Sequence, residues 1–252
     1  MGITTTYAEQ LLFTGRDGSR SAFQDVVRDG LDGGLDDRIA GLGDVVRGGS
    51  PYHALLACAA LTAWGHELGF QTLIGWATAP DRTPWAGEPV VYHPASGTDA
   101  AFETLADAVG RGAASGLTPG TRYLRVAALR AMLRIYHGYY FDRTLAIAVG
   151  SSDAAQLLHV DLRAAFERCL PLLRDQQPPF DLGFQLACLL VPLAHVDDEA
   201  AAGYACQLLE TQSHSRRVLR QLALAMTAGG GPASQAVAEA LRAAAPMRMA
   251  YR

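Results

Sequence analysis

The stretch from residue 50 to residue 77, SPYHALLACAALTAWGHELGFQTLIGWA, constrains the fold of this chain more than any other. Ser50 and Pro51 form a helix start signal, because a hydroxyl caps free backbone N–H groups and proline has none to cap. From Tyr52 to Leu68, alanine or cysteine fills most positions between the larger apolar residues, so the helix expected there has no polar face. Such a helix must be surrounded, and we predict a core helix pair over residues 50–77.

A few polar side chains interrupt this apolar stretch. His53, Thr62, His66 and Glu67 lie where each buried polar atom needs a partner or a ligand. One interpretation is a helix-lined pocket, and the other is a packed core in which the histidines are hydrogen-bonded to neighbours. On one continuous helix His53 and His66 would point about 140° apart, so only one of them would line a pocket wall. We expect His53 to be the functional one and His66 to be structural.

Charge and composition exclude several classes of protein. The net charge is −4, all 21 cationic residues are arginine, and no basic cluster exceeds Arg216, Arg217 and Arg220, which argues against nucleic-acid binding. No uncharged apolar run reaches the ~18 residues of a membrane helix, and residues 1–18 lack the features of a secretory signal, so we expect no membrane contact and a cytoplasmic location. The four cysteines lie far apart, which predicts reduced, buried thiols and no zinc site.

Helical periodicity extends through most of the chain, and strand alternation is nowhere evident. We therefore predict an all-α fold of antiparallel helical hairpins, arranged as a repeat-like array or bundle in a single domain over residues 1–252. Residues 1–49 are expected to be a flexible helical N-terminal segment, and residues 78–99, with four prolines, a lid-like loop. Later helices are predicted at residues 100–111, 121–137 with Gly138 as C-cap, 143–149, 182–194, 198–210, 215–226 and 233–244.

Two segments of the C-terminal half align at an offset of 36 residues. LLHVDLRAAFERCLPLL begins at Leu157, LAHVDDEAAAGYACQLL begins at Leu193, and both contain His-Val-Asp. A period of this size is typical of paired-helix repeats. The His-Asp pairs resemble half of a catalytic dyad, but residues two apart on a helix do not face each other. We expect Asp161 and Asp197 to cap the helices that follow them.

Recognisable catalytic motifs are missing. The chain contains no GxSxG, P-loop, dinucleotide fingerprint or complete zinc-protease motif, so no cofactor or metal is evident. What remains is a set of histidines and aromatic rings on apolar helices, which suits an apolar aromatic ligand held by a few polar contacts. The candidate catalytic residues are His53, His66 and His137, and the candidate substrate-binding residues are Tyr52, Trp64, Trp76, Trp85, Tyr139 and Tyr140.

The run IAGLGDVVRGGSPYHALLACAAL, with TLIGWA after it, resembles the segment of questin oxidase-like proteins in which a Gly-rich approach precedes a histidine-bearing core helix. His53 matches that histidine. Residues 145–158 resemble the family's second histidine-bearing helix, with Ala146, Ile147 and Ala148 where the histidine would stand, and DEAAAGYACQLLE resembles a late helix. The resemblance covers about residues 39–210, and it implies an aromatic polyketide as substrate.

Two functions remain open. The first is an enzyme of secondary metabolism that modifies an aromatic small molecule, by oxidation or by acid–base catalysis at His53. The second is a non-catalytic helical-repeat scaffold that binds a protein partner. An enzyme should have an enclosed pocket lined by His53, Trp64 and His66, whereas a scaffold should have an open face. Apolar helices on all sides favour the enclosed version, and the sequence leaves a homodimer open.

Overall fold

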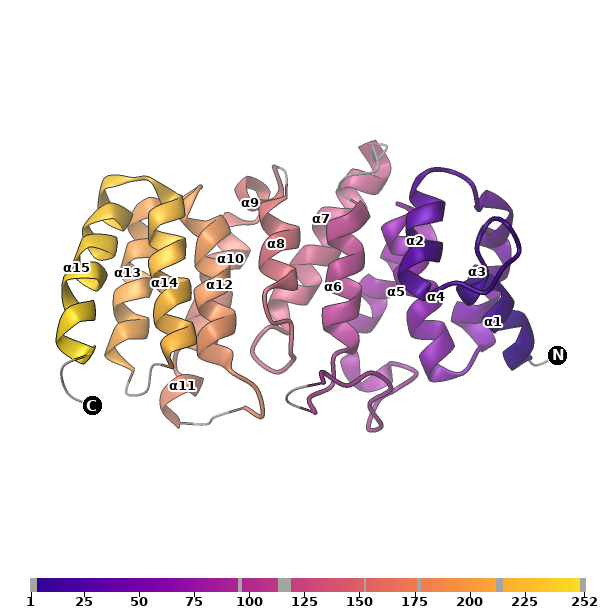
Figure 1. The fold of residues 1–252 in the computed structure, drawn as a ribbon, viewed down its shortest axis with the longest axis horizontal. Coiled ribbons are helices and arrows are strands. Elements are labelled where there is room, and N and C mark those ends of the chain that lie inside the picture. Colours follow the sequence, from indigo (N-terminus) through magenta and orange to yellow (C-terminus); the bar gives the residue numbers. More distant parts are fainter. Residues whose placement is uncertain are drawn as a thin grey trace. The chain divides into compact units, whose positions relative to one another are not determined.

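The fold is all-α (Figure 1), as predicted. This computed structural model describes residues 4–94, 97–112, 119–151, 153–175, 178–211 and 215–249. Within these ranges the β pairing consists of two isolated bridges, Thr14 with Arg20 and Tyr92 with Asp99. The chain divides into two compact units, residues 1–132 and 133–252, and the boundary falls inside α7 (Pro119–Arg134). The prediction of a single domain stays a prediction.

Unit 1 is built around α4 (Pro51–Ala63). Ser50 caps this helix by accepting a hydrogen bond from the His53 N–H, and Pro51 occupies its first turn, as predicted. Every residue from 53 to 63 is buried, which confirms that this helix is surrounded. The helices that pack on it are α1 (Thr5–Phe13), α2 (Phe23–Leu31), α3 (Ile39–Gly48), α5 (Glu67–Thr78) and α6 (Ala101–Gly112).

The helix expected to continue to residue 68 ends at Ala63 instead. Gly65 adopts a φ of +74°, a left-handed conformation that reverses the chain and that glycine reaches without strain. His66 then becomes the N-cap of α5, with its ring Nδ1 accepting a hydrogen bond from the Leu68 N–H at 3.2 Å. His53 and His66 therefore lie on different elements, and the 140° separation derived for a single helix does not apply.

The loop over residues 78–99 is anchored to unit 1. It starts with the short 3-10 helix η2 (Pro80–Arg82), and Trp85 is only 4% exposed. Near its end, Ala100 N donates to Val91 O, and the Asp99 carboxylate caps α6 by accepting from the Ala101 N–H.

Unit 2 is built around α12 (Leu182–Ala194), which has the predicted bounds. This helix packs against α8 (Thr144–Gly150), α14 (Arg216–Gly229), α13 (Asp198–Glu210) and α10 (His159–Cys169), while α14 and α13 both pack against α15 (Pro232–Met249). Successive antiparallel hairpins thus lie side by side (Figure 1). The short α9 (Ala154–Leu157) precedes α10, and α11 (Leu172–Asp175) follows it.

The end of α7 differs from the prediction. The helix stops at Arg134, so Gly138 is not its C-cap but lies in a turn in which it donates to Ile135 O. Tyr136 leaves the helix with its side chain fully buried, and its hydroxyl donates to Gln185 O at 2.6 Å. The buried tyrosine, not the glycine, therefore decides where the chain turns.

The 36-residue offset relates α10 to α13, which occupy equivalent places as the second helices of successive hairpins. Asp197 caps α13 by accepting from the Ala200 N–H at 3.0 Å, as predicted. The same prediction for Asp161 is wrong, because α10 begins two residues earlier and places Asp161 within its first turn. The next residue, Asp198, accepts from the Ala233 and Ser234 N–H groups and so caps α15 of the following hairpin.

Candidate functional site

His53 is buried, with 8% of its surface exposed, and its ring is held locally. Its Nδ1 lies 2.9 Å from the Ser50 hydroxyl, which is also the cap of α4. The neighbouring Tyr52 is 39% exposed, and its ring centroid lies 5.6 Å from that of His53. The catalytic role of His53 and the substrate-binding role of Tyr52 stay predictions.

Trp64 and His66 contribute to the structure of the turn between α4 and α5. The Trp64 indole N–H donates to Val27 O at 2.9 Å, and its ring fills the space beside Gly30, where a Cβ would lie 2.0 Å from the indole. The His66 ring caps α5. Their polar atoms therefore tie α4 to α2 and α5, which is the hydrogen-bonded core that the sequence left as the second interpretation.

Trp76 and Trp85 meet edge to face, with ring centroids 4.8 Å apart, and Trp85 also contacts Phe102 of α6 at 6.1 Å. The contact joins α5, the loop of residues 78–99 and α6. Trp85 thus packs the loop onto unit 1 through an aromatic cluster of the kind that is worth about 0.5–1.5 kcal/mol per pair beyond buried area.

The remaining predicted residues belong to unit 2. His137 is exposed, Tyr139 is half-buried, and Tyr140 is buried with its ring 6.0 Å from that of Phe180. The backbone of this turn is held by the side chain of Gln185, which accepts from Phe141 N at 2.7 Å and donates to the carbonyls of Tyr136 and Tyr139. Gln185 was not singled out from the sequence, although a lone amide in an otherwise apolar helix is a signal that could have identified it.

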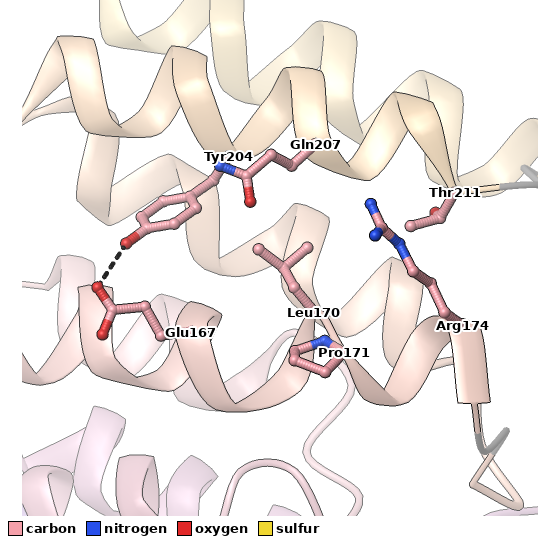
Figure 2. A pocket seen from close by; sticks show the side chains of 7 residues that line it. All are labelled: Glu167, Leu170, Pro171, Arg174, Tyr204, Gln207 and Thr211. Atoms are coloured by element: carbon pink, nitrogen blue, oxygen red, sulfur yellow. Dashed lines mark hydrogen bonds between the residues drawn. The ribbon is translucent and has the colours of Figure 1, made fainter.

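A cleft of about 510 Å³ lies in unit 2 between α10 with α11 on one side and α13 on the other (Figure 2). This volume is within the range of ligand sites, ~300–1,000 Å³. Its lining combines charged and polar side chains with apolar surface, and it consists of Glu167, Leu170, Pro171, Arg174, Tyr204, Gln207 and Thr211. We take this cleft as the candidate functional site.

The cleft exists because the hairpins of unit 2 are not evenly packed. Along the second helices, α13 packs closely on α15, whereas α10 and α13 make only sparse contact. Leu170 and Pro171 separate α10 from α11 at this point. A ring stack bridges the gap, with the centroids of Phe166 and Tyr204 4.7 Å apart and their planes 7° from parallel.

One end of the cleft is acidic and the other is basic. At the first end, the Tyr204 hydroxyl donates to Glu167 Oε1 at 3.2 Å. Burial raises the pKa of the Tyr204 phenol, and it outweighs a hydrogen bond with Arg163 that lowers this pKa, so the hydroxyl stays protonated through neutral pH. At the other end, Figure 2 shows the Arg174 guanidinium beside Thr211. Among the residues that the structure describes, the side chains of Arg174 and Gln207 make no hydrogen bond.

The sequence did not reveal this site. Its two walls, α10 with α11 and α13, are 37 positions apart at the Glu167–Tyr204 pair, and neither sequence segment indicates how far apart the walls lie. The 36-residue offset was the available signal, since it shows that α10 and α13 are successive second helices whose facing sides form one surface.

Other site types can be judged only for the described part of the chain. Its residues include no group of three or more His, Cys, Asp or Glu side chains placed to hold a metal ion. None of its helices combines the length and apolar character needed to span a bilayer. Cys58, Cys169 and Cys188 are buried free thiols, as predicted, but the prediction of burial is wrong for Cys206, which is exposed.

Comparison with known proteins gives no match to a family model, to a curated protein or to a solved structure.

Proposed function

We propose that this chain is a non-catalytic helical-repeat binding protein, and that the cleft of unit 2 binds an extended segment of a partner protein. The observation that carries this proposal is the open cleft between α10 and α13, in which the exposed side chains of Arg174 and Gln207 make no hydrogen bond to the described residues.

The lining of the cleft favours a polypeptide over an aromatic small molecule. Glu167, Pro171, Arg174 and Gln207 are exposed, so a bound molecule would keep much of its surface in water. Small-molecule sites bury most of the ligand behind apolar walls, whereas an extended peptide carries backbone N–H and C=O groups that need polar partners. The amide of Gln207 can serve both kinds of backbone group.

The enzyme hypothesis has less support. It requires a shared pocket for His53, Trp64 and His66, but Nδ1 of His53 lies beside the Ser50 hydroxyl, while the Trp64 indole and the His66 ring are used to hold α4 to its neighbours. Aromatic ligand binding at these residues stays a prediction.

Display of random peptides on the immobilised protein tests the proposed function. Peptides selected on the wild type should lose binding to Gln207→Trp, which fills the cleft, and keep binding to Gln156→Trp, which places the same ring at an exposed glutamine of α9 outside the cleft. Circular dichroism checks that both variants fold.

Failure to select any peptide, or selected peptides that bind Gln207→Trp as well as wild type, would contradict binding at this cleft. The enzyme alternative has its own test, a thermal-shift panel of polycyclic phenols. A stabilising phenol that loses its effect in His53→Ala would replace the proposed function with the enzyme.

A further inference from the structure

The charged groups at the Glu167 end of the cleft are joined to one another within the protein. The Tyr204 hydroxyl donates to Glu167 Oε1 at 3.2 Å, and it forms a second hydrogen bond with Arg163. The Arg163 guanidinium also lies 3.5 Å from the Asp197 carboxylate. Two acidic side chains, one arginine and the tyrosine therefore form a single network, and this end already contains its own cation.

The Arg174 end of the cleft has no such network. Arg174 is exposed, and its side chain makes neither an ion pair nor a hydrogen bond with the residues that the structure describes. Figure 2 shows its guanidinium beside Thr211, whose hydroxyl donates to Leu208 O at 2.7 Å. The planar fork of N–H donors on Arg174 is therefore left for a group from outside.

A carboxylate is the group that fits this end. It accepts two parallel hydrogen bonds from a guanidinium, and its single negative charge matches that of one arginine. Phosphate groups are recognised by clusters of arginines, whereas the lining residues that the structure describes include one cation, Arg174. Glu167 repels a carboxylate from the opposite end, so the charges of the cleft also determine at which end the carboxylate binds.

The middle of the cleft suits the rest of a bound segment. Leu170 and Pro171 form apolar surface on one wall, and Gln207 lies across from them on α13 (Figure 2). The Gln207 amide can pair with backbone groups, while apolar side chains cover the opposite wall.

From this arrangement we infer that the cleft anchors the partner segment by a carboxylate, which pairs with the Arg174 guanidinium. The carboxylate belongs to an Asp or Glu side chain or to the C-terminus of the segment. This inference rests on the proposed function and adds to it the chemical group by which the segment is held.

Three libraries of short synthetic peptides test the inference. The first contains Asp and Glu and ends in a C-terminal amide, the second excludes both residues and ends in a free carboxylate, and the third excludes both residues and ends in an amide. Peptides that bind the wild type and lose binding to Gln207→Trp should come from the first library, the second or both, and not from the third. The library that yields them identifies the source of the carboxylate.

Variants of Arg174 test the anchor directly, with the selected peptides as probes. In low salt, Arg174→Gln should weaken binding about fivefold, the upper size for an exposed ion pair, and the loss should shrink as salt is added. Arg174→Lys should lose less, because it keeps the charge but not the fork. Arg220→Gln removes an exposed arginine of unit 2 that does not line the cleft, and it should bind like the wild type. Melting temperatures check that each variant is folded.

Cleft-dependent peptides from the third library, or equal binding to the wild type and to Arg174→Gln, would overturn the carboxylate anchor while peptide binding at the cleft stands. If no library yields a peptide that Gln207→Trp loses, peptide binding itself fails, and the anchor fails with it.

Discussion

α4 and α12 are the surrounded helices of the two units, and they differ in how their side chains pack against the neighbouring helices. Both are 13 residues long, and both begin with a side-chain cap, from Ser50 and from Asp181. α4 contains five alanines and lets its neighbours approach closely, whereas α12 contains five leucines and fills the space itself.

The approach to α4 is close enough to exclude a methyl group. A Cβ added at Gly69 of α5 would lie 2.4 Å from Thr62 N, and one added at Gly112 of α6 would lie 3.0 Å from Thr62 O. At α12 the corresponding constraint is polar, since Gln185 holds the turn that leads from α7 to α8 through three hydrogen bonds. Unit 1 should therefore be sensitive to added volume, and unit 2 to lost hydrogen bonds.

The largest expected effect is that of Gln185→Leu in unit 2. Leucine has a similar size but removes the hydrogen bonds of the Gln185 side chain with Phe141 N and with the carbonyls of Tyr136 and Tyr139. We expect the free energy of unfolding, measured in urea, to fall by about 4 kcal/mol, because each unpaired buried group costs about 1–3 kcal/mol. The exposed Gln156→Leu is the control, and a loss at Gln185 no larger than the control's would mean that the turn is held by other contacts.

Gly69→Ala tests the close packing of unit 1. The new methyl group would collide with the backbone of α4, and we expect a loss of about 2–3 kcal/mol. Gly75→Ala on the same helix meets nothing within 4 Å and should stabilise by about 0.5–1 kcal/mol through helix propensity. Gly183→Ala in α12 would make contacts of 3.6 Å or longer and should be tolerated. An equal loss of stability in Gly183→Ala and Gly69→Ala would contradict the greater sensitivity of unit 1 to added volume.

Removing the N-cap side chain of either surrounded helix should reduce stability by a smaller amount, and the two losses should be similar. Asp181→Ala removes the acceptor of the Phe184 N–H and should cost about 1 kcal/mol by thermal or urea unfolding. Ser50→Ala should cost somewhat more, because the same hydroxyl lies 2.9 Å from the buried His53 Nδ1. A larger loss for Asp181→Ala would show that the histidine gains nothing from Ser50.

The smallest effect concerns the cysteines, one of which lies in each surrounded helix. Burial raises the pKa of Cys58, of Cys169 and of Cys188 to about 12, so these thiols stay protonated near neutral pH. A thiol reagent at pH 8 should modify only the exposed Cys206 in the folded protein and all four cysteines in denaturant.

The same pKa shifts determine the direction in which the stability of the fold changes with pH. The unfolded thiols lose their protons near pH 9, whereas the folded ones hold them to about pH 12. This contribution to stability is therefore complete below pH 9 and is lost between pH 9 and pH 12. Rapid modification of Cys58 or Cys188 in the native protein would mean that α4 or α12 opens readily.

Much of the fold could be predicted from local signals. α12 and α13 have the predicted bounds because Asp181 and Asp197 stand directly before apolar helical patterns. The full burial of α4 followed from its lack of a polar face. The misplaced boundaries have tertiary causes: periodicity continues past Trp64, but the positive φ of Gly65 ends the helix, and the burial of Tyr136 ends α7 before Gly138.

The candidate site could not be predicted in the same way. The rings and histidines of the apolar helices were identified correctly as residues that need partners, and Trp64 and His66 find those partners in the backbone. The cleft depends instead on how far α10 stands from α13. That distance is set by packing between segments of similar sequence, so neither segment alone contains it.

The position of Asp198 bears on how unit 2 folds. Its carboxylate binds the first amides of α15 from 35 positions upstream, and Gly231 is the residue that allows this approach, because a Cβ there would lie 2.3 Å from the carboxyl carbon. α15 therefore reaches its full stability only after α13 has docked, and the two helices should exchange their amide hydrogens as one cooperative unit. The C-terminal hairpin therefore owes part of its stability to the hairpin that precedes it.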